Sequence, residues 1–404
     1  MDSPLEHDVT VVGAGLAGLA AAQMCRRAGL DVVVLDAHPG GRARSDVDDG
    51  FIFNRGAHAL YRGGASEQVL QSLGVVYRGG PPGIVGGAIL AAGKQFPMPA
   101  TPATMIKSRY LGLRDKVSLG KMFAKLPKLN AADFASVPVT EFLSDMTEKA
   151  RGIAAMAIRT STYSCDFDQL SAEVAIVAMQ APGVLYIDGG WQVLVDALSA
   201  GLDVHPATAT AIGDGEVTTD RGVYRSRMVV VAAGTPAAAA RLLGSEPFDV
   251  AGPIEAACLD LGLRAAPTKP TLMAIEEPIY FSCHSPAARL APAGRFVAHA
   301  ARYVMQGEVS SPQTQRRELE AHASLVGMTD TSIVTSRYLH RMTVVGALPT
   351  ASRGGLRGRP GTEVPGRSDV LIAGDWVGPH GQLADAAFAS AKAAADRICA
   401  KLGS

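Results

Sequence analysis

The chain has 404 residues, of which 48% are hydrophobic and 19% are charged, so it can bury large cores and overall disorder is excluded. Its 38 basic and 38 acidic residues cancel, which argues against nucleic acid as a partner, because that partner needs an excess of Lys and Arg. The five cysteines form no CxxC pair, so we expect no metal site and a reducing, cytoplasmic location. An acidic N-terminal stretch and the lack of long apolar runs predict neither a signal peptide nor a membrane span.

The first predicted elements are a buried strand, a glycine-rich turn, a helix and a second strand. The β-branched run at residues 9–12 is typical of a parallel strand. It enters a GxGxxG turn at residues 13–18, and an Ala-rich helix follows over residues 16–28. Residues 31–35 form the second strand, which ends at Asp36. Strand, glycine turn, helix, strand and acid in this order predict a dinucleotide-binding motif.

Each residue type in this motif has a physical role. Gly13 permits the tight turn, Gly15 lets the backbone approach a pyrophosphate, and Gly18 lets the helix pack against the strand. The helix N-terminus offers free N–H groups to that anion, and Asp36 can accept hydrogen bonds from ribose hydroxyls. The motif does not separate FAD from NAD. The predicted cofactor contacts here are Gly13, Ala14, Gly15, Ala17, Gly18, Asp36 and Ala37.

The segment after Asp36 carries a family resemblance. Residues 40–43 read Gly-Gly-Arg-Ala, which resembles the GGR of the flavin amine oxidase, protoporphyrinogen oxidase and phytoene desaturase superfamily, and most of all its desaturase-like branch. In that family this turn lines the FAD pyrophosphate and ribityl region. The resemblance implies non-covalent FAD and contacts from Gly41, Arg42 and Arg44. The alternative for the two arginines is a solvated basic turn.

Residues 51–58 are similar to the stretch of that family that runs beside the isoalloxazine ring. Asn54 stands where the family usually has Asp, which weakens this correspondence. The resemblance implies that Gly56, Ala57 and His58 lie near the flavin. His58 is therefore a candidate catalytic residue, and the alternative is a structural histidine that is hydrogen-bonded to backbone.

The middle of the chain is expected to return to the cofactor domain. Residues 204–212 are predicted to form a strand whose backbone near Ala209 meets the adenine. A hairpin strand at residues 223–226 follows. A further strand at 228–232 leads into a loop that, by the resemblance, contacts FAD through Ala233.

The C-terminal part of the chain resembles the second flavin motif of the family. A strand at 369–373 enters Gly374 and Asp375, and after a loop an Ala-rich helix runs to about residue 402. The resemblance implies that Asp375 binds the ribityl chain or pyrophosphate. Trp376, which follows Asp375, is a second candidate catalytic residue. The implied cofactor contacts are Gly374, Asp375, Gln382, Leu383 and Ala384.

Motifs at opposite ends of the chain predict a discontinuous domain. We predict an α/β fold with a Rossmann-like FAD-binding domain of the two-dinucleotide-motif type, combined with an α+β substrate-binding domain that has a mixed sheet. The FAD-binding domain should comprise residues 1–78, 187–249 and 347–404. The substrate-binding domain should comprise residues 79–186 and 250–346.

The resemblance implies an FAD-dependent oxidoreductase that dehydrogenates or desaturates an apolar small molecule by hydride transfer to flavin N5. Oxygen or a quinone would then accept the electrons. We find no aromatic-cage motif and no acid cluster for an amine, so we expect a substrate pocket lined mainly by apolar side chains. The alternatives are an amine or amino-acid oxidase and, in another class, a non-redox flavin-dependent isomerase or binding protein. A nucleophilic Cys283 beside His284 is a weaker alternative, because no third partner is recognisable.

A basic amphipathic stretch at residues 105–129 has two interpretations. It carries seven Lys or Arg residues among apolar ones, and its single acid is Asp115. One interpretation is a pair of helices with one solvated basic face. The other is peripheral contact with an anionic membrane.

Overall fold

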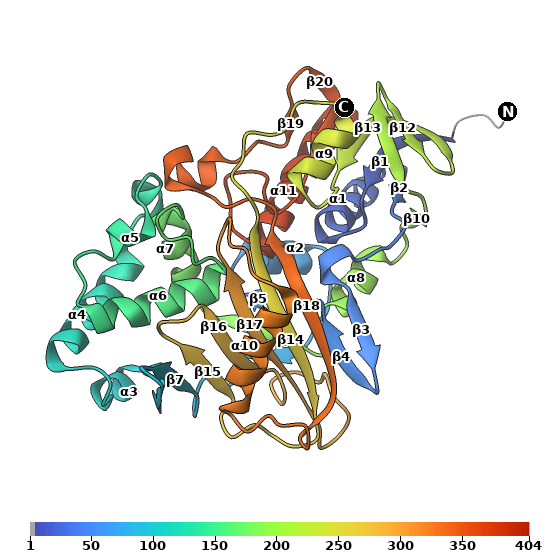
Figure 1. Ribbon diagram of the computed structural model, residues 1–404. Coiled ribbons are helices and arrows are strands. Elements are labelled where there is room, and N and C mark those ends of the chain that lie inside the picture. Colours follow the sequence, from blue (N-terminus) through green and yellow to red (C-terminus); the bar gives the residue numbers. More distant parts are fainter. Residues whose placement is uncertain (1–4, 404) are drawn as a thin grey trace.

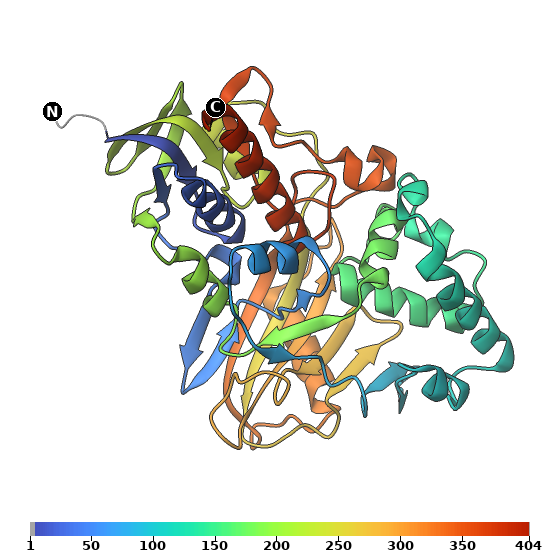
Figure 2. The ribbon, with the colours of Figure 1, turned by 180° about the vertical axis from the view of Figure 1, so that it is seen from behind.

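The computed structural model describes residues 5–403 and contains two large sheets with helices packed around them (Figures 1 and 2). Parallel strands dominate the first sheet, and mostly antiparallel strands form the second. The predicted α/β class with a Rossmann-like part is confirmed.

The first sheet is built from three separate segments of the chain. Its parallel strands lie in the order β10–β2–β1–β13–β20, and an antiparallel β12–β11 pair extends the other half of β13. The β-branched side chains of β1 and β2 are buried on both faces, as expected for strands that are covered by helices. The strands are β1 Leu5–Val12, β2 Val32–Leu35, β10 Asp203–His205, β11 Ala209–Gly213, β12 Glu216–Thr219, β13 Gly222–Val231, β19 Glu363–Val364 and β20 Arg367–Ile372.

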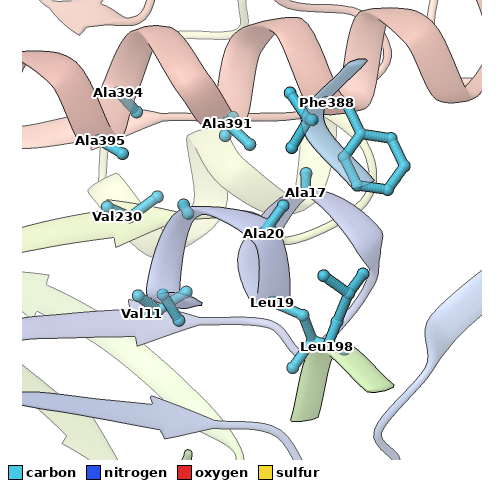
Figure 3. Close-up of a cluster of buried hydrophobic side chains, with 14 of the residues drawn as sticks. Val11, Ala17, Leu19, Ala20, Leu198, Val230, Phe388, Ala391, Ala394 and Ala395 are labelled. Atoms are coloured by element: carbon cyan, nitrogen blue, oxygen red, sulfur yellow. The ribbon is translucent and has the colours of Figure 1, made fainter. Parts of the chain in front are cut away.

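Helices from both ends of the chain cover one face of this sheet. Figure 3 shows small side chains such as Ala17, Ala20 and Ala391 between α1, α11 and the strands, where Phe388 fills the space beside α1. Alanines at these positions let the first and last helices approach each other closely. The covering helices are α1 Leu16–Arg27, α2 Ala65–Ser72, α8 Gln192–Ser199 and α11 Ala384–Leu402, and α9 Pro236–Leu243 packs on the opposite face.

The second sheet has the order β18–β14–β17–β16–β15–β7–β8 and is mixed, because β15 and β7 run parallel. Helix α10 covers one of its faces, and a group of helices stands beside the sheet (Figure 1). The strands are β7 Ala88–Ala91, β8 Lys94–Pro97, β14 Ile254–Leu263, β15 Thr271–Ala274, β16 Ile279–Cys283, β17 Phe296–Val304 and β18 Ile333–Val345. The helices are α3 Pro102–Ile106, α4 Leu113–Lys125, α5 Val139–Phe142, α6 Glu148–Thr162, α7 Ala172–Gln180 and α10 Pro312–Ser324.

Short strands connect the two parts. The hairpin of β3 Ser45–Asp48 and β4 Phe51–Asn54 lies between the sheets, and β4 contacts β17. Strand β9 Val184–Ile187 pairs with both β5 Leu60–Tyr61 and β6 Gly79–Gly80.

Two strand predictions were wrong in detail. Residues 204–212 form two strands, because Pro206 lacks an N–H donor and restricts the residue before it. The first piece pairs with β2 and the second with β12, at opposite edges of the sheet. Conversely, the predicted strands at 223–226 and 228–232 are the single strand β13, which changes partner from β12 to β20 along its length.

Candidate functional site

A cavity of about 1860 Å³ runs from the first sheet to the inner face of the second. This volume exceeds the roughly 300–1,000 Å³ of an ordinary small-molecule site, so a dinucleotide and a second molecule both have room. Its lining includes most of the residues predicted to contact the cofactor: Gly13, Gly15, Ala17, Asp36, Ala37, Gly41, Arg42, Gly56, Ala57, His58, Ala209, Ala233, Gly374, Asp375, Leu383 and Ala384.

The glycines of the β1–α1 turn divide into two kinds. Gly13 has φ +104°, and a Cβ there would lie 2.4 Å from the Ala232 carbonyl oxygen. A Cβ on Gly18, which does not line the cavity, would lie 1.8 Å from the Gly13 carbonyl oxygen. Both positions therefore require glycine for packing. A Cβ on Gly15 would meet nothing within 4 Å, so this position is open toward the cavity.

The N-terminus of α1 faces the same space. Its N-cap residue is Gly15, which has no side chain to bond the first N–H groups of the helix. Unsatisfied N–H groups together with the positive end of the helix dipole form an anion site. The turn therefore fits a pyrophosphate.

Asp36 lies at the end of β2, and its carboxylate accepts hydrogen bonds from backbone N–H groups. One carboxylate oxygen accepts from the Ala14 N–H at 2.7 Å and the other from the His38 N–H at 2.7 Å. Ala14 itself lies outside the cavity lining and its N–H positions Asp36, so its direct contact with the cofactor stays a prediction. Each carboxylate oxygen keeps a further lone pair for ribose hydroxyls.

Arg42 and Asp375 form a two-pronged ion pair on the cavity wall. Arg42 Nη1 lies 2.7 Å from Asp375 Oδ2, and Nη2 lies 3.0 Å from Oδ1. Burial alone would lower the pKa of Arg42, but the charge and the hydrogen bonds of Asp375 together outweigh burial and raise the pKa. The pair joins the GGR turn to the end of β20. A Cβ on Gly41 would lie 3.6 Å from the Gly15 Cα, so two glycines face each other where phosphates would pass.

The predicted cofactor contact of Arg44 stays a prediction, and its side chain points away from the cavity lining. The backbone becomes extended at this residue, and its side chain lies beside Asp46 at 3.5 Å, outside the cavity lining. Arg42 belongs to the single helical turn Gly41–Ala43, whereas the chain is extended at Arg44, so the two side chains leave the backbone in different directions.

A second helix N-terminus opens on the cavity at α11. Its N-cap, Leu383, has φ +55° and provides no side-chain cap, and both Leu383 and Ala384 line the cavity. Gln382 lies outside the lining and donates to the Thr162 carbonyl at 3.1 Å, and its contact with the cofactor stays a prediction. The Asp385 carboxylate accepts hydrogen bonds from the backbone N–H and the hydroxyl of Ser66. The free N–H groups of α11 can therefore stabilise negative charge in the cavity.

The two candidate catalytic residues differ in whether they line the cavity. His58 lines the cavity, its Nδ1 lies 3.0 Å from the Gly56 carbonyl oxygen, and its ring meets Trp191 edge-on at 4.9 Å. Burial lowers the pKa of His58, so the ring is neutral near pH 7. Its catalytic role stays a prediction. Trp376 lies outside the cavity lining and is buried against Phe248 with ring centroids 4.9 Å apart, and its catalytic role likewise stays a prediction.

The far part of the cavity is apolar. Its walls include Met98, Ile153, Met156, Met273, Leu339 and Met342 from the second sheet and the neighbouring helices. The carboxylates that line the cavity within residues 5–403 are Asp36, Asp46 and Asp375. Asp36 follows β2, Asp375 follows β20, and Asp46 belongs to the β3–β4 hairpin. The expected apolar lining with few carboxylates is therefore present.

Tyrosines form a rigid wall that no motif predicted. The Tyr163 hydroxyl lies 3.0 Å from the Ala57 carbonyl oxygen and 2.9 Å from the Tyr280 hydroxyl, and Tyr280 stacks on Tyr303. Burial raises the pKa of Tyr163 and Tyr280 well above the usual value, so both stay neutral. The usable signal was the alternation in β16, where Tyr280, Ser282 and His284 share the cavity face.

The alternative of a nucleophilic cysteine is contradicted. Burial raises the pKa of Cys283 to about 12, so the side chain is a thiol near pH 7. Its Sγ lies 2.9 Å from the Ser285 carbonyl oxygen and the residue is absent from the cavity lining. His284, next in sequence, does line the cavity and stacks on Tyr186 with centroids 3.6 Å apart.

A buried ion network lies beside the cavity and joins the second sheet to the β3–β4 hairpin. Asp260 and His299 are fully buried, and His299 Nδ1 lies 2.6 Å from Asp260 Oδ1. Arg337 lies 2.7 Å from Asp260 Oδ2 and 2.6 Å from Asp46 of the β3–β4 hairpin. Cys258 also approaches Asp260, but the arginine already neutralises this carboxylate. We therefore assign the cluster to fold stability.

Buried histidines should make stability depend on pH. Burial lowers the pKa of His58 and His322, and that of His284 well below the usual value. A histidine with a lowered folded pKa takes up a proton on unfolding, so its stabilisation is present above about pH 6.5 and lost as pH falls. Each such group contributes a slope of up to about 1.4 kcal/mol per pH unit. Urea unfolding between pH 7 and pH 5 should show a falling free energy.

The matched variant is His284→Phe, which keeps a ring against Tyr186. It should reduce the slope by up to about 1.4 kcal/mol per pH unit, and His340→Phe, at an exposed position, is the control. An unchanged slope in His284→Phe would show that this histidine is protonated in the folded state.

Comparisons with known proteins agree with this geometry. Residues 11–73 match the family model described as an NAD(P)-binding Rossmann-like domain. The mitochondrial protoporphyrinogen oxidase of Nicotiana tabacum is 33% identical over 115 residues, which span 28% of this chain and 23% of that protein. An oxidoreductase from Methanosarcina mazei aligns over 96% of this chain and 100% of its own, with 16% identity and a TM-score of 0.73.

A triple mutant of putrescine oxidase also aligns over 98% of this chain and 99% of its own, with 17% identity and a TM-score of 0.73. This chain shares the fold of these two structures. The similarity to protoporphyrinogen oxidase covers less than a quarter of that protein's length, and the structural likenesses stand at low identity. These likenesses establish the fold of this chain, whereas the reaction that it catalyses has to be inferred from the residues of the site.

Proposed function

We propose that this chain is an FAD-dependent oxidoreductase that dehydrogenates or desaturates an apolar small molecule. One observation carries the proposal: a single cavity connects two uncapped helix N-termini to an apolar chamber. The helix ends suit a dinucleotide with a charged pyrophosphate. The chamber suits a neutral substrate that is held beside the cofactor.

The residues present fit FAD. Asp36 would accept the ribose hydroxyls, Gly15 and Gly41 would leave room for the pyrophosphate, and the α11 N-terminus would face the flavin. The lining contains no cysteine among residues 5–403, which supports non-covalent binding. FAD, when bound, supplies the hydride acceptor for the reaction.

The chain's own residues would position the substrate and exclude water. The wall of Tyr163 and Tyr280 is neutral and fixed by hydrogen bonds, and methionines line the remaining surface. Such a chamber removes water from the reacting C–H bond and holds it in one orientation. The N–H groups at Leu383 and Ala384 would stabilise negative charge that arrives at the cofactor. Oxygen or a quinone is the proposed final electron acceptor.

An amine substrate is disfavoured by the chamber. A buried ammonium needs a partner charge, since desolvating an unpaired one is costly. Of the three lining carboxylates, Asp46 and Asp375 already pair with arginines, and Asp36 is held by backbone at the end of β2. The amine oxidase alternative therefore has no visible anion for its substrate.

Anaerobic flavin reduction tests this proposal. The FAD-loaded protein is mixed with neutral apolar compounds and with simple amines, and the loss of flavin absorbance is followed. We expect reduction by a neutral apolar compound and none by putrescine. Rapid reduction by amines alone would favour an amine oxidase, and turnover without net reduction would favour the non-redox alternative. Free FAD is the control.

Asp36→Ala is expected to weaken FAD binding by roughly 1.5–3 kcal/mol, the usual contribution of hydrogen bonds to a charged group. Part of this loss would arise because the Ala14 N–H would lose its hydrogen bond to the Asp36 carboxylate. Isothermal titration with FAD measures the change. Asp31→Ala, at the start of the same strand segment and exposed, is the control. Unchanged FAD affinity in Asp36→Ala would show that this residue does not bind the cofactor.

A further inference from the structure

We propose that a second cavity, beside α6, binds a small anion that is attached to an aromatic group. This cavity, called the lateral pocket below, has a volume of about 900 Å³, which lies within the roughly 300–1,000 Å³ of an ordinary small-molecule site. Among the described residues, none lines both this pocket and the first cavity. Its occupant is therefore neither the cofactor nor the substrate, and the proposal does not rest on the proposed function.

Helix α6 forms a wall of both cavities. Gly152, Ala155 and Arg159 follow at three- and four-residue spacing, so they share one face of the helix, and all three line the lateral pocket. Met156 and Thr160 belong to the neighbouring face and line the first cavity. The β7–β8 hairpin, α5 and the chain after β15 complete the pocket. Figure 1 places α5, α6 and β7 on the side of the molecule away from β1 and α1.

A buried arginine lies in the wall of the pocket. Arg159 is 8% exposed, and its Nη2 donates to three backbone carbonyls, those of Ala274, Ile275 and Glu277. Its Nε is buried and has no acceptor within residues 5–403. Over the same residues, Arg159 forms no ion pair with a carboxylate. The guanidinium thus has backbone partners but no paired negative charge.

An unpaired buried charge is costly, because burial removes its hydration. Burial lowers the pKa of Arg159, and the neighbouring groups of Tyr303, Cys165 and Glu276 offset only part of this effect. Arg42 on the first cavity shows the opposite case, since Asp375 raises its pKa. A carboxylate or phosphate in the lateral pocket would supply the negative charge that Arg159 lacks.

The rim of the pocket carries more bases than acids. Its exposed charged side chains are three bases and two acids: Lys94, Lys149, Arg151, Glu148 and Glu276. The Glu276 carboxylate accepts from the Ala92 N–H at 3.2 Å. Together with Arg159, the lining therefore has a net positive charge, which favours an anion over a cation.

Aromatic rings line another part of the pocket. Phe96, Tyr110 and Phe167 contribute these rings, and the centroids of Phe96 and Tyr110 lie 5.4 Å apart. Lys149 Nζ lies 5.1 Å from the Tyr110 ring centroid. An aromatic ring of the ligand would pack against these side chains while its anionic group faces Arg159. The ligand class is therefore an aromatic carboxylate or an aryl phosphate.

Tyr110 belongs to the basic stretch at residues 105–129. This stretch contains most of α3 and all of α4, and Tyr110 lies between the two helices. The arrangement fits the interpretation as a helix pair, and contact of the stretch with a membrane stays a prediction. Over the described residues, no helix combines the length and apolarity that crossing a bilayer requires.

Isothermal titration of the full chain with bound FAD tests the proposal. The probes are benzoate, its neutral isostere benzamide, its cationic isostere benzamidine, and phenyl phosphate. We expect at least one of the two anions to bind about 10-fold or more tightly than benzamide, the usual effect of a hydrogen bond to a charged group. Tighter binding of benzoate would assign a carboxylate ligand, and tighter binding of phenyl phosphate a phosphate ligand. Either result supports the proposal.

Two variants locate the binding. Ala155→Leu would fill the pocket and keep Arg159, so it should weaken anion binding at least 10-fold. The matched control is Ala321→Leu, at an exposed position of α10, which should bind like the parent chain. Arg159→Gln should weaken anion binding about 10-fold or more and leave benzamide binding unchanged. Circular dichroism checks that each variant folds, and Ala155→Leu decides alone if Arg159→Gln does not.

Three results would overturn the proposal. The first is that neither anion binds. The second is tighter binding of benzamidine than of benzoate, which would assign the pocket to a cation held by Glu148 and Glu276. The third is equal anion binding in the parent chain and in Ala155→Leu, which would place the anion elsewhere. Titration requires no turnover, so its failure is separate from failure of the proposed oxidation.

Discussion

Replacement of Gly15 with valine is expected to give a folded chain that binds no FAD. A Cβ at this position meets nothing within 4 Å of protein, so the variant has room to fold. The branched side chain would instead stand in the cavity at the N-terminus of α1. Loss of two charge-assisted hydrogen bonds at about 1.5–3 kcal/mol each should weaken FAD affinity by on the order of 100-fold or more.

Circular dichroism and flavin absorbance of the purified variant separate folding from binding. Gly213→Val is the matched control, because Gly213 is also free of contacts within 4 Å but lies in β11 outside the cavity lining. Gly18→Val should fail to fold, since its side chain would collide with the Gly13 carbonyl. Normal flavin content in Gly15→Val would show that the pyrophosphate does not bind at this turn.

Replacement of Arg337 with leucine is expected to destabilise the chain by about 3–5 kcal/mol, the usual effect of removing one partner of a buried ion pair. Asp260 is fully buried and would keep only its hydrogen-bond partners His299 and Cys258. Arg337 also donates to the Asn54 carbonyl at 2.6 Å, so the variant loses a connection between the second sheet and the β3–β4 hairpin. Urea unfolding at a fixed FAD concentration measures the loss.

An exposed ion pair provides the control for this prediction. Arg289 lies 2.9 Å from Asp188, and its side chain is 77% exposed. Arg289→Leu should change stability by no more than about 1 kcal/mol, as exposed pairs usually do. Equal effects of the two substitutions would show that the Asp260 network is not a principal source of stability.

The sequence was most informative where function needs a local pattern. The GxGxxG turn, Asp36 and the GGR turn occupy short segments, and each residue's role follows from its own backbone or side chain. Asn54, the departure from the family pattern, is explained by the structure: its side-chain oxygen accepts from the Trp191 N–H at 2.8 Å. An amide can serve this structural role as well as a carboxylate.

Other features depend on contacts between distant segments. The tyrosine wall joins residues more than 100 positions apart, so the alternation in β16 indicates the face of Tyr280 but not its contact with Tyr163. Trp376 follows a cofactor motif but turns into the core, because adjacent residues point in different directions. The break of 204–212 into two strands, by contrast, was predictable from Pro206.

The flavin content of the purified chain tests the central claim most directly, namely that three separated segments build one non-covalent FAD site. Acid precipitation followed by absorbance and chromatography of the supernatant gives the amount and identity of released flavin. We expect one FAD per chain, all of it released, and full reloading of the stripped protein. A chain that neither contains FAD nor takes it up, or whose flavin stays with the precipitate, would contradict this account.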